Sequence, residues 1–337
     1  MKGRIGFLLS IVLVLSVVLA ACAPATTVEP EIEIKNAEEP TEIPPTAVET
    51  EEPTLEPESV AIALEDDLGV EVVLEEPAQK IISITPSMTE ILFAIGAGDR
   101  LIGRDSNSTY PEAAVEVVDL GGMWDGIPVE DILAMEPDLI LAGEIYSADA
   151  IAELRDLGLT VFWQANPKDF DGLYGNIRDL AVLTGMEDQA EDLITGLNGR
   201  VAALDEKLID VEEMPLVFYE LDASEPATPW TAGYGNHISH IINRAKATNI
   251  GDVLEGEWVQ ISSEELVAQN PDVILLADSP YGVTVESVAE RAGWCNIKAV
   301  VDGEVYPFDP FYLSVPGPRL VDGYEQVAAI LHPEIFE

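Results

Sequence analysis

Two tryptophans and two glutamates stand at the same spacing in two copies of one short motif. Trp124 precedes Glu130 by six residues, and Trp258 precedes Glu264 by six residues. An indole in a loop can lie against a large, partly flat and partly apolar ligand. A carboxylate at the start of a helix is favoured by the helix dipole even without a partner. The chemistry expected of this pattern is therefore recognition rather than bond breaking.

The two copies match over ten residues in register. We infer two lobes of similar build, each presenting one Trp and one Glu. The second copy runs from Leu254 to Leu275 at a constant offset. The matched residues of the first copy are Leu120, Gly122, Trp124, Ile127, Glu130, Ala134, Pro137, Asp138, Ile140 and Leu141.

Strands that alternate with helices are predicted to position these residues. Apolar runs predict strands over 80–85, 101–103, 117–120, 139–142 and 159–163, and helices are predicted over 129–135 and 148–157. Ser87 and Glu90 have the spacing of a capping box at the start of another helix. This alternation predicts an α/β fold with a parallel sheet that is covered on both faces.

In such sheets ligands bind at the carboxyl ends of the strands. Four loops of the first lobe follow strands, over 85–87, 104–110, 121–126 and 143–146. They bring Arg104, Tyr110, Trp124 and Tyr146 toward one edge, where we expect them to contact the ligand. Glycines surround Trp124, which favours a loop position over a place in an apolar core.

The chain is predicted to have five parts. Residues 185–209 include a long helical pattern, 188–208, which we expect to brace two lobes, although a helix that packs on one lobe only would give the same pattern. The other parts are a leader at 1–22, an acidic Pro-rich tether at 23–59 without ordered structure, a first lobe at 60–184 and a second lobe at 210–337.

The formal net charge of −47 argues against binding to nucleic acid, because a phosphate backbone requires a basic surface. A salty environment is one explanation of this acidity. The leader has Lys2 and Arg4 before an apolar run that ends at Leu19-Ala20-Ala21-Cys22. This tetrapeptide resembles the bacterial lipobox, so we expect a lipid on Cys22 that holds the protein at the outer face of a membrane.

The motifs of common enzymes are absent from the sequence. It contains no Gly-rich phosphate loop, no metal-ligand spacing and no nucleophile elbow. His237 and His240 share a predicted helix without a neighbouring Glu motif or Cys, which favours a structural role over metal binding. We therefore expect a binding protein without a cofactor or a metal of its own, and not an enzyme.

The motifs together resemble one known family. The leader and lipobox, the stretch IISITPSMTEILFAIGAGDRLIG, the segment STYP, and the two Trp/Glu units with EPDLILA and NPDVILLA are similar to cobalamin and iron–siderophore solute-binding proteins of ABC importers. The resemblance covers residues 60–332. It implies two Rossmann-like lobes joined by one rigid helix, with the ligand in the cleft between them, outside the cytoplasm.

The resemblance also implies roles for single residues. Trp124 matches a cobalamin-contacting Trp, and Trp258 and Trp230 match aromatic positions of the facing lobe. Glu130 and Glu264 match the two carboxylates that dock onto arginines of the permease dimer, one from each lobe. We expect a monomeric partner of that permease.

The ligand is left open between a corrinoid and a ferric siderophore. The iron-ligating Tyr of haem-binding relatives has no clear match in the loop of Trp124, and Cys295 has no partner for the disulfide of the best-known cobalamin binders. Arg104 could meet an anionic siderophore. Two other classes remain alternatives, namely an enzyme on the same scaffold that processes a chelate and a surface interaction module.

Overall fold

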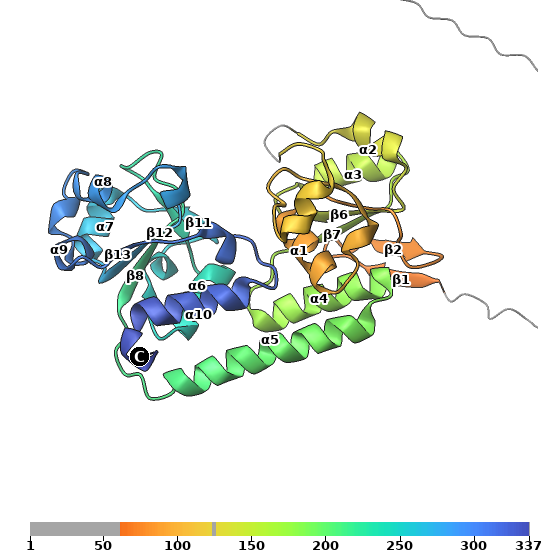
Figure 1. The fold of residues 1–337 in the computed structure, drawn as a ribbon. Coiled ribbons are helices and arrows are strands. Elements are labelled where there is room, and N and C mark those ends of the chain that lie inside the picture. The colour runs from red at the N-terminus through yellow and green to blue at the C-terminus, as the bar shows by residue number, and fades with distance from the viewer. Residues whose placement is uncertain (1–60, 123–125, 337) are drawn as a thin grey trace, which may run out of the picture. The chain divides into compact units, whose positions relative to one another are not determined.

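The computed structural model describes residues 61–122 and 126–336 (Figure 1). The predicted leader and tether, Cys22 and Trp124 lie outside the described residues. Among the residues that are described, no helix is both long enough and apolar enough to cross a membrane.

The first lobe is built on a five-stranded parallel sheet with the strand order β5-β4-β3-β6-β7. All five residues of the interior strand β6 are buried, as expected for a parallel strand with helices on both faces. An antiparallel hairpin, β1 (Ile62–Glu65) with β2 (Glu71–Leu74), precedes the sheet. The strands of the sheet are β3 (Ile81–Ser83), β4 (Leu101–Arg104), β5 (Val118–Asp119), β6 (Leu139–Gly143) and β7 (Val161–Gln164).

The second lobe is built on a four-stranded parallel sheet with the order β10-β8-β12-β13. A separate antiparallel pair, β9 with β11, carries Trp230 and Trp258. The strands are β8 (Leu216–Glu220), β9 (Trp230–Ala232), β10 (Thr248–Asn249), β11 (Trp258–Gln260), β12 (Val273–Leu276) and β13 (Val305–Pro307). Two parallel sheets in one chain confirm the predicted α/β class.

The helices follow the predicted alternation with small shifts of their ends. In the first lobe they are α1 (Pro86–Ala94), α2 (Val129–Met135), α3 (Ala148–Asp156) and α4 (Phe170–Thr184). The connection is α5 (Glu187–Leu208), and the second lobe has α6 (His237–Arg244), α7 (Ser263–Gln269), α8 (Val285–Ala289), α9 (Lys298–Asp302) and α10 (Leu320–Leu331).

The repeated motif has the same structure in both lobes. Helices α2 and α7 each span seven residues and end at a residue in the left-handed conformation, Glu136 (φ 49°) and Asn270 (φ 55°). Two residues after each of these positions, an Asp side chain accepts a hydrogen bond from a backbone N–H at the beginning of the first strand of its sheet. Asp138 Oδ1 lies 3.0 Å from the N of Lys80, and Asp272 Oδ2 lies 2.8 Å from the N of Leu216. The Pro-Asp pair therefore ties each short helix to the sheet behind it.

The helix α5 packs on both lobes (Figure 1). It lies alongside α4 below the first sheet and contacts α10 of the second lobe. On its exposed side, Arg200 forms ion pairs with Asp322 and Glu325 of α10. The prediction of a brace is confirmed, and the alternative of a helix on one lobe is wrong.

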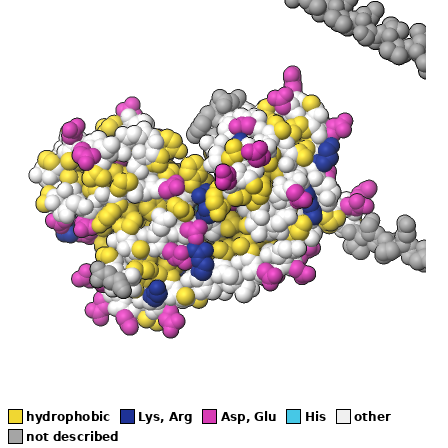
Figure 2. All heavy atoms as spheres, in the orientation of Figure 1, with side chains coloured by type: hydrophobic (Ala, Val, Ile, Leu, Met, Phe, Trp, Pro, Cys, Tyr) yellow, Lys and Arg dark blue, Asp and Glu magenta, His cyan; other side chains and the backbone are white. Residues whose placement is uncertain are grey.

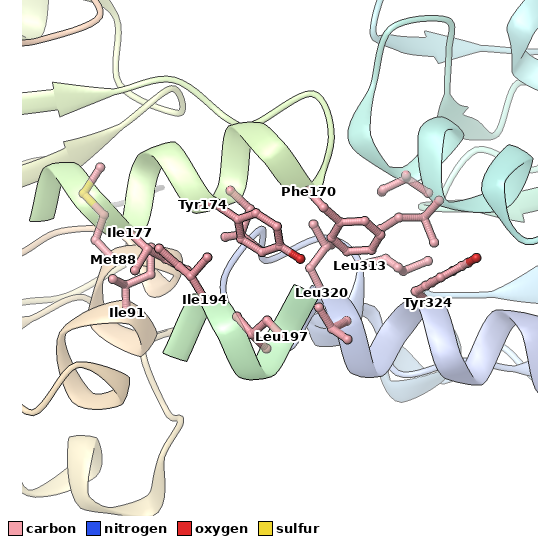
Figure 3. Close-up of a cluster of buried hydrophobic side chains, with 14 of the residues drawn as sticks. Met88, Ile91, Phe170, Tyr174, Ile177, Ile194, Leu197, Leu313, Leu320 and Tyr324 are labelled. Carbon is pink, nitrogen blue, oxygen red and sulfur yellow. The ribbon is translucent and has the colours of Figure 1, made fainter. Parts of the chain in front are cut away.

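One hydrophobic core runs through the junction of the lobes (Figure 3). Met88, Ile91 and Ile177 lie at its first-lobe end, and Leu320 and Tyr324 of α10 lie at its second-lobe end. Phe170 stands between them, with its ring centroid 5.6 Å from that of Tyr324. Because burial of these side chains requires both lobes, the junction is a packed core and not an exposed linker.

The predicted capping box at the start of α1 is wrong. The N-cap residue is Thr85, and it makes no side-chain cap hydrogen bond. Pro86 occupies the first turn, where its missing N–H costs nothing. Glu90 is buried and points instead at Arg319, which is 229 positions away in the sequence.

Candidate functional site

A cleft of about 560 Å³ lies between loops from the two lobes. Its lining residues follow strands of both sheets, as expected for a ligand site of parallel α/β lobes. The first lobe contributes Thr85, Pro86, Ser87, Asn107, Glu144, Ile145 and Asn166. The second lobe contributes Trp258, Tyr281, Pro310, Phe311, Ser314, Val315 and Pro316.

The turn from β3 into α1 forms part of the first-lobe wall. Ser83 Oγ donates to the carbonyl oxygen of Thr85 at 3.0 Å, which holds the turn in place. Gly143, at the end of β6, allows the two loops to approach closely. A Cβ at position 143 would lie 3.2 Å from Thr85 Oγ1. The absence of a side chain at residue 143 therefore keeps Thr85 and Ser87 next to the loop of Glu144.

The loop after β6 is held by three hydrogen bonds. The N–H of Tyr146 donates to Gly143 O at 3.0 Å, and Trp163 Nε1 donates to Tyr146 O at 3.1 Å. The backbone N–H of Asn166, after β7, donates to Glu144 Oε2 at 3.0 Å. The carboxylate of Glu144 is thus tied to the wall of the cleft, although its side chain is exposed.

Trp258 forms part of the second-lobe wall. It starts β11 and is paired with Ala232 of β9, and Gln260 is paired with Trp230. Side chains of paired residues, and of residues two apart in one strand, share a face of an antiparallel pair, so Trp230 and Trp258 lie on the same face. His237 supports Trp258 at a ring-centroid distance of 6.2 Å in an edge arrangement. Trp230 is exposed and is not among the lining residues of the cleft.

His237 is a structural residue, as the sequence indicated. Its Nε2 lies 2.8 Å from the carbonyl oxygen of Leu313, just before the cleft-lining Ser314. Burial lowers the pKa of His237 to about 4, so the imidazole is neutral at neutral pH. Among the described residues, no group of three or more His, Cys, Asp or Glu side chains is arranged to hold a metal ion.

The structure brings few of the predicted ligand residues to the cleft. Trp258 lines it, whereas Tyr110, Tyr146 and Arg104 do not. Tyr146 packs against the core of its own lobe. The Tyr110 ring is exposed and lies over the guanidinium of Arg319, with 4.1 Å from Arg319 Cζ to the ring centroid.

Arg104 has an internal role that the sequence did not reveal. The residue is buried, and its Nε donates to Ala114 O at 2.9 Å. Its Nη1 donates to Asp105 O at 2.9 Å and forms an ion pair with Asp119 at 3.4 Å. Contact with an anionic ligand is not supported by this position, because the donors of Arg104 are directed at backbone and side-chain oxygens of its own lobe.

The lining residues that sequence reasoning missed are small, polar or proline-linked. Asn107, Glu144 and Asn166 each follow a strand of the first sheet within a few residues. Phe311 and Ser314 belong to a loop after β13 that is rich in aromatic residues and proline. The loops 104–110 and 143–146, which contain Asn107 and Glu144, were expected to reach the ligand, but only through their large or basic side chains. The loops after β7 and β13 were not among those expected to reach it.

Glu130 and Glu264 occupy equivalent, exposed positions. Each is the second residue of its seven-residue helix, α2 or α7. The Asp131 and Glu265 carboxylates follow at the same offset and are also exposed. Acidic side chains are spread over both lobes in Figure 2, and basic side chains are few.

Two α/β lobes on a shared core, with a cleft at the carboxyl ends of their strands, define a solute-binding protein of the two-lobed class. The chain belongs to the periplasmic binding protein family, whose model matches residues 81–311. The resemblance to solute-binding proteins of ABC importers is thereby confirmed.

Several known proteins are similar over most of their length. An uncharacterized ABC transporter substrate-binding lipoprotein, YvrC of Bacillus subtilis, is 33% identical over 82% of this chain and 87% of its own length. A cobalamin-binding protein of Halobacterium salinarum is 27% identical over 79% of this chain and 73% of its own length. The crystal structure of the periplasmic vitamin B12-binding protein BtuF of Vibrio cholerae aligns with a TM-score of 0.66 and 28% identity, over 76% of this chain and 98% of that one.

Proposed function

We propose that the protein captures an uncharged, amide-rich metal chelate of the corrinoid class in the interlobe cleft and delivers it to an ABC permease. The observation that carries this proposal is the chemistry of the cleft. Among the described lining residues, hydroxyl and amide side chains stand beside the aromatic rings of Trp258, Tyr281 and Phe311, and none is basic. Aromatic and apolar surface suits the flat face of a corrin, and hydroxyl and amide groups suit its peripheral amides.

The positions of the arginines argue against a ferric siderophore or a haem that is held through its negative charges. All eight arginines of the described residues are engaged within the protein. Arg100 donates to the carbonyl oxygens of Ala78 and Thr184. The other seven form ion pairs with Asp or Glu side chains. An anionic chelate would therefore have to break an existing pair to gain an arginine. The cobalamin-binding names of two similar proteins agree with this preference.

We propose that Glu130 and Glu264 dock onto basic residues of the permease, one from each lobe. Their exposure and equivalent helix positions support symmetric docking onto a dimer. Charged pairs in such an interface would chiefly steer and orient the encounter. A lipid on Cys22 would keep the monomeric protein close to the membrane that holds the permease.

We expect no catalytic step. Among the described lining residues, Ser87 and Ser314 are potential nucleophiles, but no histidine or lysine lines the cleft with them. Ser314 Oγ lies 3.1 Å from the hydroxyl of Tyr219. Burial raises the pKa of Tyr219, so this hydroxyl is protonated at neutral pH and is not a base for Ser314. The carboxylate of the described lining, Glu144, accepts the backbone N–H of Asn166, and among the described residues no hydrogen bond joins it to either serine, so neither serine is paired with a base.

Isothermal titration of the mature protein with cyanocobalamin, dicyanocobinamide, a ferric hydroxamate, a ferric tricatecholate and haemin tests the proposal. Saturable binding of the two corrinoids, and weaker or no binding of the others, is the expected result. Tight binding of the tricatecholate or of haemin, with no response to the corrinoids, would refute the corrinoid assignment. Unchanged corrinoid after prolonged incubation, judged by its visible spectrum, checks the absence of catalysis.

A further inference from the structure

Glu144 is the one charged side chain among the described residues that line the cleft. It is exposed and directly follows β6, in the loop that Trp163 and Tyr146 hold in place. Its Oε2 accepts the backbone N–H of Asn166 at 3.0 Å. This hydrogen bond ties the carboxylate to the wall of the cleft through Oε2 and leaves Oε1 available to a ligand.

The negative charge of Glu144 has no basic counterpart in the described lining. The basic residue nearest in sequence to any described lining residue is Lys168, two residues after Asn166, and its Nζ lies 2.5 Å from Oε1 of Glu257. Glu257 directly precedes Trp258, so this ion pair links the two sides of the cleft and uses the charge of Lys168. The cleft therefore presents a net negative charge to whatever enters it.

A fixed carboxylate acts on a ligand through charge and through hydrogen bonding. At a separation of a few ångströms in a partly buried site, one unit of ligand charge changes the affinity on the order of tenfold. An oxygen held in place also accepts a hydrogen bond from an amide N–H at little cost in entropy. Both effects favour a neutral or cationic ligand with amide donors over an anionic ligand.

We propose that Glu144 is a specificity-determining residue that selects ligands by charge, excluding anionic chelates and accepting an amide N–H of the bound one. This proposal rests on the assignment of the cleft as a chelate site. It extends that assignment by naming the group that discriminates among chelates of similar shape. The rest of the described lining is uncharged and recognises the shape and apolar surface of the ligand. Glu144 determines which sign of ligand charge the cleft accepts.

A series of corrinoids of closely similar shape that differ in charge tests the role of Glu144. Aquocobalamin carries one positive charge, cyanocobalamin is neutral, and the derivative with one side-chain amide hydrolysed to a carboxylate carries one negative charge. Isothermal titration should give affinities that fall in this order for the wild-type protein. In Glu144→Gln, which keeps an acceptor for the N–H of Asn166, the ratio of affinities for the cation and the anion should shrink by about tenfold or more.

Glu153→Gln is the matched control, because Glu153 lies on the exposed side of α3 and does not line the cleft. This control should keep the wild-type ratio. The proposal would be overturned if the ratio of cation to anion affinity were the same in wild type and Glu144→Gln. It would also be overturned if Glu153→Gln reduced this ratio as much as Glu144→Gln does. The ratio of the wild type should also shrink in high salt, since the Debye length falls to about 3 Å at 1 M.

A second series separates failure of this proposal from failure of the corrinoid assignment. If the wild-type protein binds none of the corrinoids, the same comparison is made with a cationic ferrioxamine, a neutral ferrichrome and an anionic ferric tricatecholate. A charge trend that Glu144→Gln flattens in this second series would support the role of Glu144 while the corrinoid assignment falls. No binding of any probe in either series by the folded protein would overturn both.

Discussion

The guanidinium of Arg319 and the carboxylate of Glu90 meet across the boundary of the two lobes, with 2.5 Å between Nη2 and Oε1. Both side chains are nearly excluded from solvent. The Cζ of Arg319 lies 4.1 Å from the ring centroid of Tyr110, from the first lobe, and 5.6 Å from that of Tyr312. Glu90 and Tyr110 thus hold the segment that leads from the cleft into α10.

Replacing Glu90 should change how stability depends on pH. Burial raises the pKa of Glu90 from 4.5 to about 7, and the hydrogen bond from Arg319 opposes this shift. The folded state therefore holds more protons than the unfolded state between these two values, so the contribution of Glu90 to the free energy of unfolding is lost as the pH rises from 4.5 to about 7. Glu90→Gln, which does not titrate, should remove this contribution. Urea unfolding of both proteins across this range measures the difference.

Two other groups provide controls for that measurement. Burial also raises the pKa of Glu220, which pairs with Arg291 inside the second lobe, to about 7, so Glu220→Gln should remove a contribution of the same sign. His237 acts in the opposite direction, because its lowered pKa makes the fold lose stability as the pH falls from 6.5 to about 4. A difference profile between wild type and Glu90→Gln that is flat from pH 4.5 to about 7 would contradict the role given to Glu90.

Removing the ring of Phe170 should destabilise both lobes together. This residue is buried at the centre of the shared core, and Phe→Ala substitutions in cores cost about 3–5 kcal/mol. Because the core is continuous, we expect a single unfolding transition that moves to lower urea. Trp fluorescence and circular dichroism should report the same midpoint. Phe336→Ala, at a partly exposed position, should cost less than about 1 kcal/mol, and two separated transitions in Phe170→Ala would contradict a shared core.

Trp258→Ala should weaken ligand binding by about tenfold or more, since buried aromatic contacts commonly contribute more than about 1 kcal/mol. Trp230→Ala removes an indole of similar exposure from the same face of the β9–β11 pair, but outside the cleft lining, and should have a smaller effect. Isothermal titration with cyanocobalamin compares the two variants. Equal losses of affinity for both variants would mean that the ligand covers the whole face of the β9–β11 pair and not the cleft alone.

Docking on the permease should depend on Glu130 and Glu264 and not on acidity in general. The double variant Glu130→Ala/Glu264→Ala should bind ligand normally in solution but deliver it poorly, because both positions are exposed and lie outside the cleft lining. Asp131→Ala/Glu265→Ala removes the same charge from the same two helices and is the matched control. Ligand-stimulated ATPase activity of the permease in proteoliposomes measures delivery. An equal loss of ATPase stimulation in both double variants would mean that docking depends on the total negative charge and not on Glu130 and Glu264 in particular.

The elements that depend on local patterns could be predicted from the sequence. The buried strands β6 and β12, the helices α2 and α7, and the connection α5 all follow from apolar runs and helical spacing. The register of the two Trp/Glu units was predictable because the same residues recur at one offset. These features require only neighbours in the chain.

The partners of buried charges could not be predicted. Glu90 has the spacing of a capping residue, yet its partner Arg319 is brought to it only by the packing of α1 against the second lobe. Arg104 has the side chain of a ligand anchor, yet nearby backbone carbonyls occupy its donors. Spacing along the chain does not reveal which of several oxygens a long cationic side chain will reach. Glu144 lies in the loop 143–146, which was expected to reach the ligand, but the sequence does not show which side chains of a loop line the cleft.

The core that joins the two lobes through α4, α5 and α10 has a consequence for transport. A frame that is packed in this way should offer almost the same outer contour whether its cleft is filled or empty. Empty carriers would then compete with filled ones for the transporter, and uptake would be governed by the fraction of carriers that hold cargo when they arrive.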